Sequence, residues 1–114
     1  MATRKLPRPV EAFREDYAEV WRAFTELGDR CHRSGPLDAR TRRLVKLALA
    51  VGAGLEGATH SAVRNALAEG VTPEEIKQVA VLGVTTFGFP AAMRALTWIG
   101  DGLAPEDDST EARD

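Results

Sequence analysis

Residues 70–76 read Gly-Val-Thr-Pro-Glu-Glu-Ile, and this stretch decides the fold because it ends one helix and starts another. Gly70 is typical of the position just past a helix C-terminus. Thr72 can cap the helix that follows, Pro73 suits its first position, and Glu75 completes a capping box. The segments on both sides of this stretch are therefore predicted to be helical.

Working outward from this stretch, breaks at glycine and proline divide the chain into about five helices. The β-branched run Val84-Thr85-Thr86 would suit a strand, but nothing else in the chain could pair with it. We therefore predict an all-α fold. The expected helices cover about residues 9–33, 39–53, 55–69, 73–87 and 91–100.

The first and second helices differ in how their apolar residues are arranged. The first carries one apolar stripe with three- and four-residue steps, made of Phe13, Tyr17, Val20, Trp21, Phe24 and Leu27. The second is apolar almost all round, so it should lie centrally, and Asp38 is a good N-cap for it. Its first turns hold Arg40, Arg42 and Arg43, which suit the positive end of the helix dipole poorly. We therefore expect these arginines either to have an acidic partner or to serve a function.

Length and composition suit one domain and exclude several classes of protein. The chain has 114 residues, a net charge of -2 and 44% hydrophobic residues, a balance that does not favour nucleic acid or an acidic membrane surface. No apolar run approaches the roughly 20 residues of a membrane-spanning helix, and the N-terminus does not resemble a secretory signal. Cys31 is the only cysteine, so no intrachain disulfide can form, and the cytoplasm is the expected compartment.

The domain organisation follows from the same reading. Residues 1–8 are expected to form a flexible arm, residues 9–102 the helical domain, and residues 103–114 a disordered acidic tail.

Several of these segments, in this order and spacing, resemble the carboxymuconolactone decarboxylase-like family, which includes alkylhydroperoxidase D. The resemblance covers about residues 10–100 and implies an alkylhydroperoxidase D-like bundle around a helical hairpin. It also implies a homo-oligomer, a trimer or a hexamer, with pockets near the subunit contacts. Two tryptophans and four phenylalanines in so small a chain agree with self-association. The segments that carry the resemblance are residues 37–42, 56–70, 71–76 and 88–92.

The peroxidase branch of that family uses a Cys-x-x-Cys pair, a histidine and an upstream acid. Matched on residues 63–70, the cysteine positions fall on Leu55 and Ala58, the histidine position on Ala62 and the acid position on Arg43. All four are replaced, and the histidine position that the decarboxylase branch shares is lost as well. Thiol peroxidase activity is therefore not expected.

Glu56 and His60 are the candidate catalytic residues. Their i, i+4 spacing puts them on one helix face, where a carboxylate can orient an imidazole for general acid or base work. Arg64 continues the row, so the three residues could instead be a charged helix face. Arg43 is the candidate substrate-binding residue because a guanidinium can hold a carboxylate, although solvation or an ion pair would also account for it.

Other chemistry has weaker support. His32 follows Cys31 directly, and adjacent residues on a helix do not face each other, so a Cys-His dyad is not expected. Two distant histidines and one cysteine give no metal-ligand set. No cofactor is expected either.

Two functions remain open on these grounds. The first is a cofactor-independent enzyme, a decarboxylase-like lyase, that performs acid/base chemistry on a small anionic lactone or carboxylic acid. The second is a catalytically silent relative that binds a ligand or serves as an oligomeric partner subunit. Retention of Glu56 and His60 favours the first function, and loss of the four peroxidase positions favours the second.

Overall fold

The structure is a computed structural model that describes residues 7–104. In this part of the chain it contains six α-helices and one 3₁₀-helix and no strand, which confirms the predicted all-α class. The expected arm and acidic tail lie outside the described residues, apart from residues 7–8 and 103–104. The chain divides into two compact units, one through Pro36 and one from Leu37 onward.

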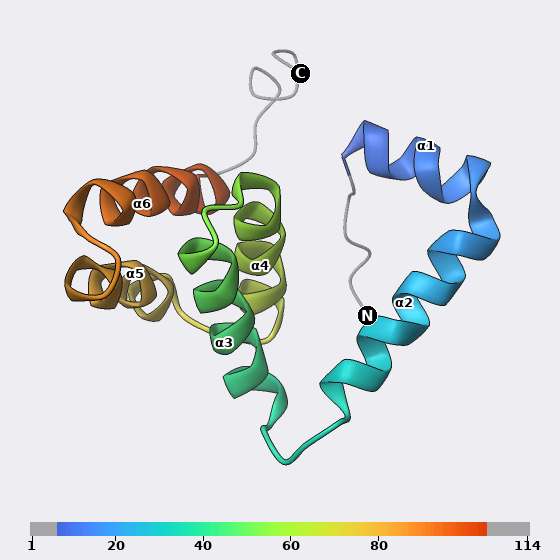
Figure 1. Cartoon of the computed structure of the whole chain (residues 1–114), viewed down its shortest axis with the longest axis horizontal. Helices are drawn as coiled ribbons and strands as arrows, with labels where there is room; N and C mark the ends of the chain where they lie inside the picture. The colour runs from blue at the N-terminus through green and yellow to red at the C-terminus, as the bar shows by residue number, and fades with distance from the viewer. Residues whose placement is uncertain (1–6, 105–114) are drawn as a thin grey trace. The chain divides into compact units, whose positions relative to one another are not determined.

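The N-terminal unit is a pair of helices, α1 (Arg8–Asp16) and α2 (Ala18–His32). Pro9 lies in the first turn of α1, as its fixed φ angle favours. The single long helix predicted from the apolar stripe is interrupted at Tyr17, where φ is -129° and ψ is 54°. Figure 1 shows the two helices meeting at an angle there. No proline or glycine marks this position, so the periodicity of the sequence could not predict the break.

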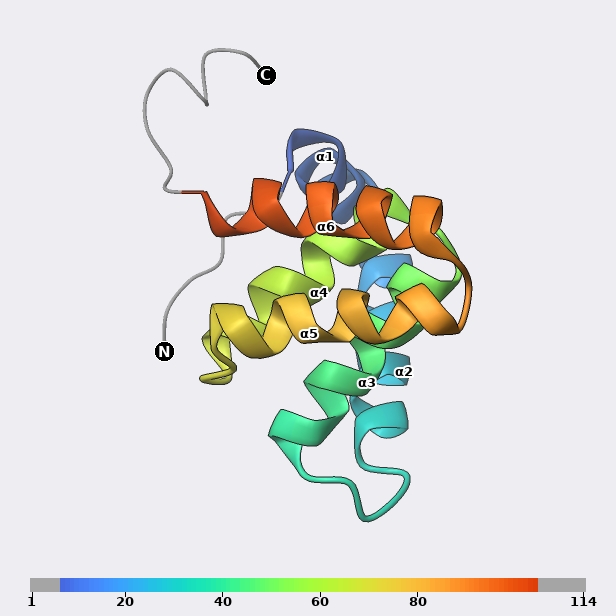
Figure 2. The ribbon, with the colours of Figure 1, turned by 90° about the vertical axis from the view of Figure 1, so that its left-hand side faces the viewer.

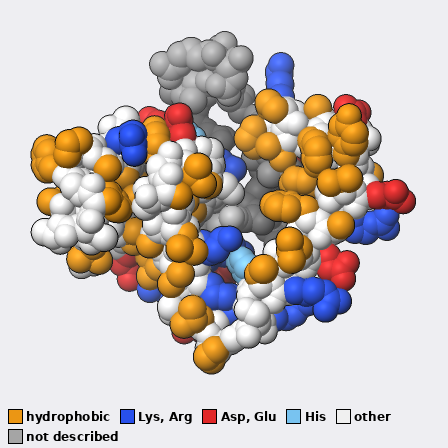
Figure 3. Space-filling view, viewed as in Figure 1, with side chains coloured by type: hydrophobic (Ala, Val, Ile, Leu, Met, Phe, Trp, Pro, Cys, Tyr) orange, Lys and Arg blue, Asp and Glu red, His pale blue; other side chains and the backbone are white. Residues whose placement is uncertain are grey.

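Neither helix of the N-terminal unit has a buried residue. Within this pair of helices nothing covers the apolar stripe, and Phe24 is 63% exposed. Hydrophobic side chains accordingly gather along α1 and α2 in the space-filling view (Figure 3).

The second unit consists of two pairs of helices. The first pair is α3 (Ala39–Gly52) and α4 (Glu56–Ala68). The second pair is α5 (Pro73–Leu82) and α6 (Phe89–Leu103), joined by the 3₁₀-helix η1 (Gly83–Thr85). Figure 2 shows α5 and α6 lying in front of α3 and α4, and α6 contacts α4 while α5 contacts α3.

The core lies between these two pairs of helices. Leu47 on α3, Val63 on α4, Ile76 on α5 and Ile99 on α6 are all fully buried. Alanines fill much of the remaining interface, and their small side chains allow the helices to approach closely. Within this unit α3 buries one face in the core, and Val45 and Leu49 on its other face are exposed.

Local signals set most helix ends in this unit. Asp38 caps α3 by accepting a hydrogen bond from the Thr41 amide at 2.8 Å, as predicted. The capping box predicted at Thr72 and Glu75 is present at the start of α5. Gly70 has φ 88° at the end of α4, the left-handed conformation expected just past a helix C-terminus.

The end of α5 is set by packing. The aromatic ring of Phe87 lies over Gly83, where an added Cβ would come within 2.1 Å of the ring. The predicted helix towards Phe87 therefore ends at Leu82 and continues only as η1. Gly88, with φ 103°, then starts α6.

Candidate active site

His60 lies on α4 and faces the end of α6. Its Nε2 atom is 3.6 Å from Oδ2 of Asp101, slightly beyond hydrogen-bond distance. The side chain is 30% exposed, yet the Nε2 atom itself is buried and has no hydrogen-bond partner. Buried polar atoms nearly always have a partner. The imidazole therefore has one nitrogen, Nε2, that lies beside a carboxylate and is not engaged in a hydrogen bond.

A close approach of two helices brings Asp101 to this position. Gly102 packs against Val63, one turn along α4 from His60, and a Cβ at Gly102 would be 2.9 Å from the Val63 side chain. Only a glycine leaves room for that contact. Helix α6 also continues to Leu103, beyond the end near Gly100 that the sequence predicted. Asp101 therefore lies within its last turn, beside His60.

Glu56 lies in the first turn of α4 and is exposed. The structure shows no hydrogen bond or ion pair between Glu56 and His60. An acidic residue in this turn interacts favourably with the helix dipole, which gives Glu56 a structural role without any chemistry. The carboxylate that the structure places beside His60 is therefore that of Asp101, which the sequence interpretation missed.

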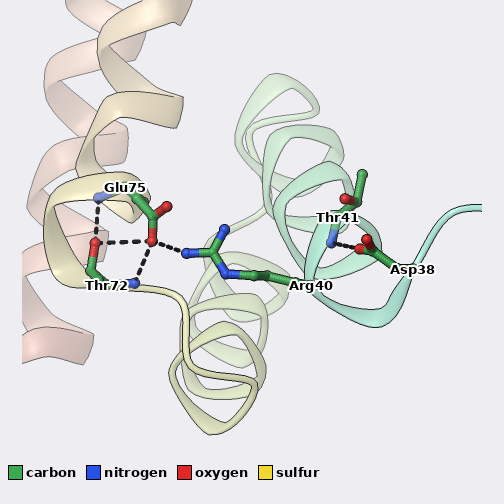
Figure 4. A network of polar contacts seen from close by, with 5 residues as sticks. All are labelled: Asp38, Arg40, Thr41, Thr72 and Glu75. Atoms are coloured by element: carbon green, nitrogen blue, oxygen red, sulfur yellow. Dashed lines mark hydrogen bonds and ion pairs between the residues drawn. The ribbon is translucent and has the colours of Figure 1, made fainter.

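The three arginines at the start of α3 have different surroundings. Arg40 forms an ion pair with Glu75, which supplies the acidic partner that the sequence called for (Figure 4). Arg42 donates a hydrogen bond to the carbonyl of Leu37. Arg43, the candidate substrate-binding residue, is half-buried on α3.

The contact between Arg40 and Glu75 joins α3 to the start of α5. The hydrogen bond from Arg40 and those from the amide and hydroxyl of Thr72 lower the pKa of Glu75 from 4.5 to about 2. The same carboxylate oxygen accepts all three of these bonds. This network accounts for Arg40 as a structural residue.

The remaining family positions carry no titratable side chain except Arg43. Leu55 precedes α4 and is exposed, as is Ala58, whereas Ala62 is buried. Cys31 is an exposed free thiol on α2. Within residues 7–104, no cluster of three or more histidine, cysteine, aspartate or glutamate side chains could hold a metal ion.

The fold and the site together define a small all-α protein with a histidine and a carboxylate between its fourth and sixth helices. The model of the carboxymuconolactone decarboxylase family matches residues 18–101, and the chain belongs to that family. No curated protein and no solved structure gives a significant match. Among the described residues, the helices are all too short or too polar to cross a membrane.

Sequence reasoning found His60 but had little means of finding Asp101. Asp101 lies between Gly100 and Gly102, just before the predicted acidic tail and beyond the point where the last helix was expected to end. Its neighbour Gly102 was the available signal, because a glycine in the last turn of an apolar helix can mark a close helix contact.

Proposed function

We propose that the chain performs acid/base chemistry on a small anionic organic molecule, a lactone or a carboxylic acid, with His60 as the general acid or base. The observation that carries the proposal is the buried Nε2 atom of His60, 3.6 Å from the Asp101 carboxylate and without a hydrogen-bond partner. Histidine is the side chain that exchanges protons most readily near neutral pH.

Asp101 takes the orienting role in this proposal. A carboxylate beside one nitrogen of an imidazole fixes its tautomer and stabilises the cation that forms when it takes up a proton. Glu56, on the same helix, is a second candidate for orienting His60 from its exposed position. Arg43 is proposed to hold the substrate's carboxylate, because guanidinium and carboxylate groups pair through two hydrogen bonds.

Self-association is part of the same proposal. The exposed apolar side chains of the described residues support a homo-oligomer, and a trimer or a hexamer is expected from the family resemblance. Light scattering coupled to gel filtration measures the mass directly, and a monomer at micromolar concentration would contradict this part of the proposal.

The first experiment is a thermal-shift screen of the full chain against lactones and small carboxylic acids, followed by turnover assays on the compounds that bind. His60→Ala is expected to lower turnover about 10²–10⁴-fold, the usual loss for a general acid or base. Asp101→Asn should lower it less and shift its pH profile, because it acts through His60. An unchanged rate in His60→Ala on a confirmed substrate would end the proposal.

Control variants separate chemistry from folding. Asp101 is 59% exposed, and exposed ion pairs contribute only about 0–1 kcal/mol to stability. Neither His60→Ala nor Asp101→Asn should therefore unfold the protein. Arg64→Ala tests the charged-face interpretation of the same helix and should leave turnover almost unchanged. Glu56→Gln decides whether Glu56 or Asp101 is the carboxylate that matters. Circular dichroism of each variant checks that the helices persist.

The second candidate function is that of a silent ligand-binding or partner subunit. The replacement of the family's cysteine and histidine positions by Leu55, Ala58 and Ala62 favours it. In that case the thermal-shift screen would find a ligand that no assay converts. Cys31→Ser should leave either activity intact, because a lone cysteine cannot close an intrachain disulfide.

A further inference from the structure

The last turn of α6 has a composition that disfavours a helix. Its residues read Gly100, Asp101, Gly102 and Leu103, and glycine is the least favourable residue for a helix after proline. Asp101 also places a negative charge at the negative end of the helix dipole, and no basic residue accompanies it in that turn. The order of this turn therefore depends on contacts from outside the helix.

Those contacts come from α4 and from the core. Gly102 packs closely against Val63, and Leu103 packs against the core cluster. The third contact joins Nε2 of His60 to Oδ2 of Asp101 at 3.6 Å. The first two are apolar, so the contact at His60 is the one of the three that protonation can change.

Protonation of the imidazole strengthens this third contact. In a neutral histidine one ring nitrogen carries a proton and the other is an acceptor, whereas both nitrogens donate in the cation. The buried Nε2 atom has no hydrogen-bond partner, so in the cation it presents an N–H group to the Asp101 carboxylate. The positive charge also offsets the unfavourable position of Asp101 at the end of the helix dipole.

The other charged groups around His60 do not replace Asp101. Glu56 and Arg64 lie one turn before and one turn after His60 on α4, and their charges are opposite. Helices α3, α5 and α6 all pack against α4. Within residues 7–104, Asp101 is the one charged residue of these three helices that forms an ion pair with His60. The other charged residues of the three helices are Arg40, Arg42, Arg43, Lys46, Glu74, Glu75, Lys77 and Arg94.

We infer that proton uptake by His60 orders the last turn of α6, and that Asp101 transmits the effect from one helix to the other. The stabilisation of the turn is present in acidic solution and is lost as the pH rises through the range in which histidine releases its proton. This device concerns the conformation of a helix end and does not depend on the chemistry proposed for His60. A catalytically silent subunit would have it as well.

Hydrogen exchange of single backbone amides, followed by NMR on the full chain, tests the inference. The Ala104 amide donates to the Gly100 carbonyl at 3.1 Å and closes the turn. Its exchange, relative to that of an unstructured peptide at the same pH, should slow about two- to fivefold from about pH 8 to about pH 5.5. Histidine ordinarily changes charge in that range and aspartate does not. The ring signals of His60 should change over the same range.

The end of α3 supplies an internal control in the same spectra. The Ala53 amide donates to the Leu49 carbonyl at 3.0 Å, in a last turn without a charged residue. Its relative exchange should stay constant with pH. A wild type in which the Ala104 and Ala53 amides respond alike would overturn the inference.

Three variants identify the groups responsible. In His60→Gln the side chain can donate a hydrogen bond but cannot take up a proton, and in Asp101→Asn the carboxylate is gone, so both should lose the pH response of the Ala104 amide. Gly100→Ala is the matched control, because an added Cβ there meets nothing within 4 Å. It should slow exchange by up to about fivefold at every pH through helix propensity and keep the response. A response that persists in His60→Gln or Asp101→Asn would refute the coupling.

Gly102→Ala tests whether the close contact of the two helices carries the effect. Its Cβ would come within 2.9 Å of the Val63 side chain and displace the turn, so the Ala104 amide should exchange faster and lose its pH response. An unchanged response in this variant would refute transmission through the contact between α4 and α6.

Discussion

The N-terminal helix pair and the four-helix unit carry similar apolar side chains but place them differently. Helices α1 and α2 have a clear apolar stripe and no buried residue. Helices α3 to α6 surround a core in which Leu47, Ile76 and Ile99 are completely removed from solvent. The difference shows that an amphipathic pattern predicts a helix and a face, whereas burial also requires enough other helices to cover that face.

The largest expected effect is in the core. Ile76→Ala should lower the free energy of unfolding by about 2–5 kcal/mol, because it removes buried methyl groups and leaves a cavity. Urea unfolding followed by circular dichroism measures this loss. Phe24→Ala is the matched change in the N-terminal pair, and its effect should depend on protein concentration because it acts through association. A loss of several kcal/mol from Phe24→Ala that is independent of concentration would contradict the comparison.

Two glycines give opposite signs in the two units. Gly83→Ala should destabilise the protein by roughly 1–3 kcal/mol, because the new Cβ would collide with the ring of Phe87. Gly28→Ala on α2 meets nothing within 4 Å and should gain up to about 1 kcal/mol of helix propensity. Thermal unfolding of both variants decides the matter, and equal shifts of the same sign would refute it.

Capping also distinguishes the two units. Thr72→Ala removes the hydroxyl that accepts from the Glu75 amide at 3.2 Å and should cost about 1 kcal/mol. Thr25→Ala in the middle of α2 removes only a bond to the Arg22 carbonyl and should stay within about 0.5 kcal/mol. In urea unfolding, Thr72→Ala is expected to have a lower free energy of unfolding than Thr25→Ala. The reverse order would be evidence against a capping role of Thr72.

The smallest expected effect is a dependence on pH. The pKa of Glu75 is lowered from 4.5 to about 2 by Arg40 and Thr72, so its contribution to stability is complete above pH 4.5 and is lost as pH falls towards about 2. Glu75→Gln should therefore lose less stability than the wild type across that window. Arg40→Gln should lie between them, since the contacts from Thr72 remain. Urea unfolding at several pH values measures the slopes, and parallel curves for all three proteins would contradict the assignment.

Much of the fold could be predicted because its signals are local. The cap at Asp38, the capping box at Thr72 and the left-handed Gly70 each depend on a few neighbouring residues, and all three are confirmed. The break at Tyr17 and the early end of α5 at Leu82 could not be predicted in this way. The second of these depends on where the ring of Phe87 packs, which is a tertiary contact.

The candidate site also contains one residue that local signals identify and one that only a tertiary contact brings into place. His60 was identified from its helix and its spacing, and Glu56 was expected beside it. The structure places Asp101 there, because α6 approaches α4 through Gly102. A partner 41 residues away in sequence cannot be read from periodicity on one helix.

The sequence by itself determined the helices, most of their ends and the apolar faces, because caps, turns and periodicity act within a few residues. Only the tertiary structure decided which faces are covered. It buries Ile76 and Ile99, joins Arg40 to Glu75 and sets Asp101 beside His60. Each of these depends on how segments distant in the chain pack together. Close packing admits few arrangements of side chains, and no local pattern in the sequence encodes which arrangement is adopted.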